Sequence, residues 1–151
     1  MASSNIQLTE RLGPLAGNLD NLQSAVWDAA RDPVVLELCR LQVAAMLHAD
    51  EAGSTRSAAA VAAGLDEAKV SALAEWHTSP LFDERERSYL DFTEQFVTSV
   101  RHVSDAQITS LCAHDDERHV CDFIAALYAL ELATRVALVS RVVLAPEEAA
   151  A

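Results

Sequence analysis

Hydrophobic positions in this chain recur mainly at the three- and four-residue spacing of an α-helix. The run after Pro33 places four apolar residues on one helical face: Val34, Leu38, Leu41 and Ala45. No stretch shows the convincing alternation of a β-strand. The pattern therefore predicts an all-α helical bundle of about seven helices. These are expected over residues 20–31, 33–50, 55–63, 67–77, 84–100, 105–112 and from 115 or 116 to 144.

Residues that favour helix starts support these boundaries. Capping side chains are expected at Asp32, Ser54, Asp66, Asp83 and Ser104. Asp32 stands before Pro33, whose missing N–H costs nothing at the first helical position. The last two caps are followed three residues later by Glu86 and Gln107, which is the spacing of a capping box. Gly64 is the natural residue to end the third helix.

The chain has 151 residues, a length typical of one domain, and we expect a single domain over residues 1–151. Residues 1–17 are weakly patterned and are predicted to form an irregular arm. The first residues contain no apolar run of signal-peptide length, so we expect a cytoplasmic protein.

The net charge of the chain limits the classes of partner it can bind. The formal net charge of −12 argues against a nucleic acid or an anionic membrane as partner, because both require a basic face. The predicted last helix is the most apolar segment, but Asp122, Glu131, Arg135 and Arg141 interrupt it. We therefore interpret it as a buried helix or an oligomer interface rather than a membrane span.

Two acidic residues on apolar helices are candidates for chemistry. Glu37 lies among leucines, where a carboxyl at the edge of a pocket could transfer a proton. The alternative is an exposed pair with Arg40 three residues later, and periodicity alone favours that alternative. Glu131 and Arg135, four residues apart, could form a charged wall of a pocket or a structural ion pair.

Metal and thiol motifs are weak. His114 and His119 are five residues apart, which does not align them on one helical face, so we expect no metal and no cofactor. The three cysteines are Cys39, Cys112 and Cys121, and no C-x-x-C motif occurs. Each is expected to be an inert single thiol.

Several segments together resemble the alkylhydroperoxidase D-like / carboxymuconolactone decarboxylase family, over roughly residues 34–143. They are LELCRLQV, AAAVAAGLDEAKVSALAEW, SPLFDERERSYLDFTEQF and HVSD. The resemblance implies the helical bundle of that family and a homo-oligomer, a trimer or a hexamer.

Peroxidases of that family carry E-x11-C-x-x-C-x3-H. In this chain the resemblance places Glu37 on the glutamate, Ala49 and Ala52 on the two thiols, and Arg56 on the histidine. Of the family's late N-x-x-N-R motif, only Arg135 matches. Alanine has no thiol, so the thiol peroxidase activity is expected to be absent.

The leading hypothesis is a cofactor-free protein that binds a small organic molecule and carries out lyase- or isomerase-type acid–base chemistry. Glu37 would be the acid or base, and Arg56 or Arg135 would hold an anionic group. By the resemblance, the surrounding space is lined by His48, Ala49, Glu51, Ala52, Arg56, Glu131 and Arg135. On this hypothesis, Glu37→Gln abolishes turnover and leaves the melting temperature nearly unchanged.

Two alternatives remain open. One is a redox-silent, non-catalytic protein kept for its oligomeric binding surface. The other is residual thiol peroxidase activity through Cys112 and Cys121.

Overall fold

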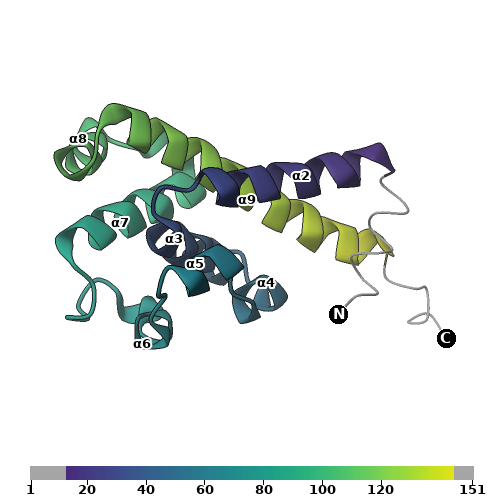
Figure 1. Ribbon diagram of the computed structural model, residues 1–151, viewed down its shortest axis with the longest axis horizontal. Helices are drawn as coiled ribbons and strands as arrows, with labels where there is room; N and C mark the ends of the chain where they lie inside the picture. The colour runs from purple at the N-terminus through teal and green to yellow at the C-terminus, as the bar shows by residue number, and fades with distance from the viewer. Residues whose placement is uncertain (1–12, 145–151) are drawn as a thin grey trace.

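The computed structural model describes residues 13–144, and within them every regular element is a helix (Figure 1). The all-α prediction is thus confirmed. The α-helices are α2 (Pro14–Ala29), α3 (Pro33–Met46), α4 (Asp50–Ser54), α5 (Ala58–Ala62), α6 (Glu67–Ser71), α7 (Glu84–Ser99), α8 (Asp105–His114) and α9 (Glu117–Leu144). Two short 3₁₀ turns, η1 (Leu73–Glu75) and η2 (Val100–His102), join α6 to α7 and α7 to α8.

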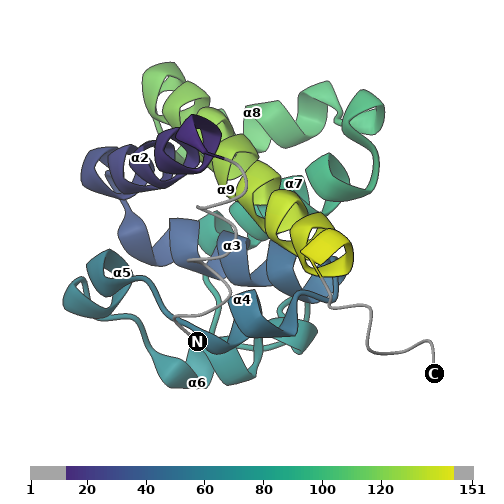
Figure 2. The same ribbon diagram turned by 90° about the vertical axis from the view of Figure 1, so that its right-hand side faces the viewer.

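Helix α3 is the centre of the bundle. It packs on α7 and α9 and also contacts α4 and α5, while α2 packs against α9 (Figures 1 and 2). Its core side chains include Leu36, Leu38 and Val43, all nearly inaccessible to solvent. Burial of such aliphatic side chains contributes about 1.5–3 kcal/mol each, which makes α3 the main source of the hydrophobic core.

Aromatic rings join α7 to α9. The rings of Tyr89 and Phe123 meet edge to face with centroids 4.6 Å apart. Phe92 contacts Phe123 at 6.2 Å in a similar geometry. Such pairs add about 0.5–1.5 kcal/mol beyond the area they bury, so this seam fixes how the two helices face each other.

Most predicted caps are present. Asp32 accepts the backbone N–H of Val35 at 3.0 Å, and Asp66 accepts that of Ala68 at 2.8 Å. Both capping boxes, beginning at Asp83 and Ser104, are complete. Gly64 follows α5 with a φ of 90°, a value that favours glycine.

The predicted boundaries are wrong near the N-terminus. Helix α2 begins at Pro14 rather than near residue 20, so residues 14–17 are helical and not part of an irregular arm. Pro14 occupies a first-turn position where proline is favourable, and Gly13 takes a φ of 56° just before it. The rest of the predicted arm, residues 1–12, lies outside the described residues.

Boundaries in the middle of the chain also differ. Helix α3 stops at Met46 because His48 has a left-handed φ of 54°, and the separate helix α4 follows. Ser54 therefore ends α4, and Ser57 takes the capping position of α5. The predicted helix 67–77 is also shorter, since α6 ends at Ser71 and gives way to η1.

Helix α9 is long and apolar enough over Glu117–Val142 to span a membrane by length and composition. One such helix is weak support for a span, because core helices pass the same test. Its first half supplies core residues such as Phe123 and Leu127. Its second half leaves apolar side chains in solvent, with Val139 63% and Val142 80% exposed.

Candidate functional site

Glu37 and Arg40 form a buried ion pair on α3. The side chain of Glu37 is 0% exposed and that of Arg40 only 12% exposed. Arg40 Nε donates to Glu37 Oε2 at 2.7 Å, and Arg40 Nη2 donates to Oε1 at 2.8 Å. Oε1 also accepts the backbone N–H of Ser57 at 2.9 Å. Both oxygens of this carboxylate are therefore occupied by charge-assisted bonds.

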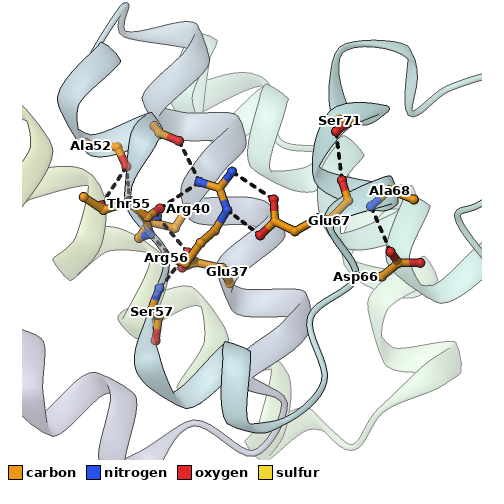
Figure 3. A network of polar contacts seen from close by, with 11 residues as sticks. Glu37, Arg40, Ala52, Thr55, Arg56, Ser57, Asp66, Glu67, Ala68 and Ser71 are labelled. Carbon is orange, nitrogen blue, oxygen red and sulfur yellow. Dashed lines mark hydrogen bonds and ion pairs between the residues drawn. The ribbon is translucent and has the colours of Figure 1, made fainter.

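The same guanidinium reaches the chain beyond α3. Arg40 Nη1 donates to the carbonyl oxygen of Ala52 at 2.8 Å, and Nη2 donates to that of Thr55 at 2.9 Å (Figure 3). We refer to Glu37, Arg40, the N–H of Ser57 and the carbonyls of Ala52 and Thr55 as the α3 clamp. The pairing with Arg40 is the alternative that the sequence offered, but the pair is buried rather than exposed.

Arg56 belongs to a neighbouring pair and not to the clamp itself. Its guanidinium binds the carboxylate of Glu67 at 3.0 and 3.2 Å, and Nη1 donates to the carbonyls of Gly53 and Thr55 (Figure 3). The Thr55 carbonyl thus accepts from both Arg40 and Arg56. The structure brings Glu37 and Arg56 into one network, in which the groups of Arg56 serve backbone and carboxylate acceptors.

The remaining residues of the predicted neighbourhood take separate places. Ala49 is buried at the start of α4, and Ala52 is half-buried within it. Glu51 pairs with Arg141 of α9 at 2.8 Å, whereas His48 is exposed. The Ala52 carbonyl belongs to the α3 clamp, but among the described residues no polar contact joins the side chains of His48 or Glu51 to Glu37.

Glu131 and Arg135 form the predicted pair on α9. Arg135 Nε and Nη2 both donate to Glu131 Oε1, at 2.9 and 2.7 Å. The Glu131 side chain is 10% exposed and that of Arg135 is 50% exposed. No polar contact among the described residues joins this pair to the α3 clamp.

A cavity of about 360 Å³ lies elsewhere, between α2 and α9 at the start of α3. Its wall is mostly apolar and rich in small side chains from both helices, among them Ala25, Ala29, Ala126 and Ala129. Larger apolar groups, Leu36 and Phe123, complete it. The cavity exists because alanine side chains end at Cβ. Where α2 and α9 pack against each other through alanines, these side chains do not fill the space between the helices.

One end of the α2–α9 cavity is polar. Arg31, Asp32, Arg118, His119 and Asp122 line it. The charged groups there are paired with groups of opposite charge: Arg118 Nε donates to Asp122 Oδ1 at 3.1 Å, and Asp32 accepts from Arg85 at 2.6 Å.

His119 is connected to a carboxylate behind the cavity wall. Its Nδ1 lies 3.6 Å from Oδ1 of Asp115. The other oxygen of Asp115 accepts from Arg85 Nε at 2.7 Å and from the hydroxyl of Tyr89 at 2.8 Å. Asp32 binds the same guanidinium, so four elements of the fold meet at Arg85 and Asp115.

The environment keeps Asp115 ionised and Tyr89 protonated. Burial acts to raise the pKa of the Asp115 carboxyl, but the hydrogen bonds from Arg85 and Tyr89 outweigh it and lower that pKa below 3.8. Burial and the hydrogen bond to Asp115 raise the pKa of Tyr89 above its ordinary value of 10.0. A fixed negative charge therefore stands beside His119 at neutral pH.

Sequence reasoning missed this pair because it compared His119 with His114, five residues away. The informative spacing is the one between Asp115 and His119, which is i,i+4. The structure supplies what the spacing could not, namely that α2 and α9 leave a cavity on that side of α9.

The cysteines are separate from both sites. Cys39 is fully buried in the core, and its burial raises the pKa of the thiol to about 12. Cys112 and Cys121 are exposed free thiols. A thiol held protonated in this way is a poor nucleophile.

The fold has a known counterpart. The chain superposes with a TM-score of 0.79 on a crystal structure of a protein of unknown function from Agrobacterium tumefaciens, described as a candidate antioxidant defence protein AhpD. The two share 18% sequence identity, and the match covers 89% of this chain and 92% of the other. No protein-family model and no curated protein matches the sequence. The chain therefore has the AhpD-like fold, as its sequence resemblance implied.

Proposed function

We propose that this protein binds a small organic molecule with an apolar body in the α2–α9 cavity, on an AhpD-like fold that does not carry out thiol peroxidase chemistry. The observation that carries the proposal is the cavity itself. Its volume of about 360 Å³ lies within the roughly 300–1,000 Å³ of ligand sites. An apolar wall with a few polar groups gathered at one end is the usual composition of such sites.

The α3 clamp supports a structural role for Glu37. A general base needs a free lone pair within reach of a substrate proton. Glu37 is fully buried, and both of its oxygens accept hydrogen bonds from Arg40 or Ser57. We therefore assign acid–base chemistry to another part of the molecule and let Glu37 hold α3 against the α4–α5 connection.

The thiol positions support the absence of peroxidase activity. By the family resemblance they are taken by Ala49 and Ala52, in and before the first turn of α4. The core thiol of Cys39 is inaccessible. The antioxidant role suggested for the Agrobacterium protein is accordingly not carried over to this chain.

Binding is tested with 1-anilinonaphthalene-8-sulfonate, whose fluorescence rises in apolar sites. Ala126→Phe places a ring in the cavity, and Ala106→Phe makes the same change at an exposed position of α8. We expect the first variant to weaken probe binding at least about tenfold, which corresponds to about 1.4 kcal/mol, and the second to leave it unchanged. Equal affinity in wild type and Ala126→Phe would contradict the proposal.

A second candidate function is assembly. The exposed side chains of Val139 and Val142 lie on the second half of α9. Exposed apolar surface of this kind marks interaction sites in soluble proteins. We propose a homo-oligomer whose subunits meet through this half of α9, and this is compatible with ligand binding at the other half.

A further inference from the structure

We propose that His119 and Asp115 form an acid–base dyad that serves the α2–α9 cavity, with His119 taking a proton from the bound molecule. The proposal rests on the proposed function, because it requires a molecule in that cavity. It adds the reaction class, proton transfer at an acidic C–H or O–H group, and the residue that performs it.

The dyad is held by its surroundings rather than by itself. Oδ2 of Asp115 accepts two hydrogen bonds from α7, one from Arg85 and one from Tyr89, both shorter than 2.9 Å. This leaves Oδ1 to face Nδ1 of His119 at 3.6 Å. Catalytic hydrogen bonds are often longer than ideal before a ligand binds, so this distance suits a poised pair.

The two nitrogens of the His119 imidazole differ: one faces Asp115, and the other is available to accept a proton. Facing a carboxylate, Nδ1 carries the proton of the neutral ring, which leaves the lone pair on Nε2. Nε2 makes no hydrogen bond within residues 13–144, although the side chain is only 14% exposed. The ring also meets the edge of Tyr89, with centroids 6.4 Å apart. His119 is thus fixed in place and lines the cavity with one nitrogen uncommitted.

The step that this arrangement performs is balanced without any further reagent. Nε2 accepts the proton of a C–H group next to an electron-withdrawing group such as a carbonyl, and the C–H electron pair moves into the enolate. The resulting imidazolium is stabilised by the ionised Asp115. Where the ligand is a β,γ-unsaturated carbonyl compound, the anion is a dienolate, and return of the same proton to its γ-carbon gives the α,β-unsaturated isomer and restores the neutral imidazole.

The test uses 5-nitrobenzisoxazole, a small apolar probe that reports proton removal. A base takes the ring C–H proton, the electron pair forms the nitrile, and the N–O bond breaks to give a coloured nitrophenolate. We expect the wild-type protein to accelerate this reaction and His119→Gln to lose about a hundredfold or more of the acceleration. His114→Gln, a matched change at an exposed position, is expected to retain it.

The outcomes of these experiments distinguish the acid–base dyad from ligand binding in the cavity. If His119→Gln still binds the fluorescent probe but loses turnover, both proposals are supported. If wild type binds that probe and turns over the benzisoxazole no faster than buffer, or if His119→Gln is as active as wild type, the dyad is refuted and ligand binding stands. If Ala126→Phe binds the probe and turns over the benzisoxazole as well as wild type does, the cavity is refuted as the site of both.

Asp115 is a positioning residue, and its role is read from the tautomer of the His119 ring. We expect ¹⁵N spectra of the neutral His119 ring to show the proton on Nδ1 and the bare nitrogen at Nε2. Asp115→Asn is expected to lose this tautomer preference. A wild-type ring protonated on Nε2 would overturn the assignment, because that ring offers no base to the cavity.

Discussion

The α3 clamp makes Glu37→Gln the most informative single change in the protein. Glutamine has nearly the same shape as glutamate and keeps one acceptor oxygen, but it removes the charge that balances Arg40. The Arg40 side chain, which is 12% exposed in the wild-type protein, is then left with only neutral acceptors, the Ala52 and Thr55 carbonyls among them. Removal of one partner from a buried ion pair costs about 3–5 kcal/mol, because it leaves an uncompensated buried charge.

The retained hydrogen bonds of glutamine place the expected loss near the lower limit, about 3 kcal/mol in the free energy of unfolding. For a chain of this size, each kcal/mol shifts the melting temperature by about 2–4 °C, so the expected decrease is roughly 6–12 °C. Urea unfolding followed by circular dichroism measures the free energy, and a thermal scan measures the shift. This expectation is opposite to that of a catalytic Glu37, for which stability would be nearly unchanged.

Two further variants make the test specific. Glu67→Gln is the same substitution in the exposed pair with Arg56, where Glu67 is 64% exposed, and should change stability by no more than about 0.5 kcal/mol. Arg40→Lys keeps the charge but loses the planar fork that serves the carboxylate and two carbonyls, so it should also destabilise. A Glu37→Gln protein as stable as Glu67→Gln would refute the structural role of the clamp.

Three other predictions concern the cysteines, the acid range and assembly. Because burial raises the pKa of the Cys39 thiol to about 12, Ellman's reagent should titrate only Cys112 and Cys121 in the native protein and all three thiols in denaturant. The lowered pKa of Asp115 contributes stability above pH 3.8, and this stability is lost as the pH falls through the pKa of Asp115 in the folded protein. The difference in melting temperature between wild type and Asp115→Asn should therefore shrink as the pH falls over that range. A constant difference would contradict this prediction. Val139→Glu should reduce the particle mass measured by light scattering, whereas a wild-type monomer would exclude the proposed interface.

Local signals in the sequence predicted most of the fold. The caps at Asp32 and Asp66 and the two capping boxes depend on hydrogen bonds within three residues, and these are properties of the local chain. The predicted helix boundaries are wrong where a single backbone angle ends a helix. The left-handed φ of 54° at His48 ends α3 four residues early, and a non-glycine residue gives little sequence warning of such a value.

The candidate site was harder to predict, because its parts meet only in three dimensions. The pairing of Glu37 with Arg40 follows from spacing, but its burial depends on the α4–α5 connection folding back over α3. Asp115 and His119 also have a readable spacing. Their connection to α7 depends on Arg85 and Tyr89, 30 and 26 residues before Asp115, which no local pattern reveals.

The α3 clamp does not depend on which side chains stand at positions 49 and 52. Arg40 binds the α4 region through carbonyl oxygens, which every residue type has, and not through the side chains at those positions. The clamp's hydrogen bonds therefore hold α3 to the α4–α5 connection through backbone groups and not through the side chains at 49 and 52. The α2–α9 cavity draws on none of the clamp's residues. A change of side chain at 49 or 52 therefore concerns one end of α3, whereas the α2–α9 cavity and His119 lie at the other end.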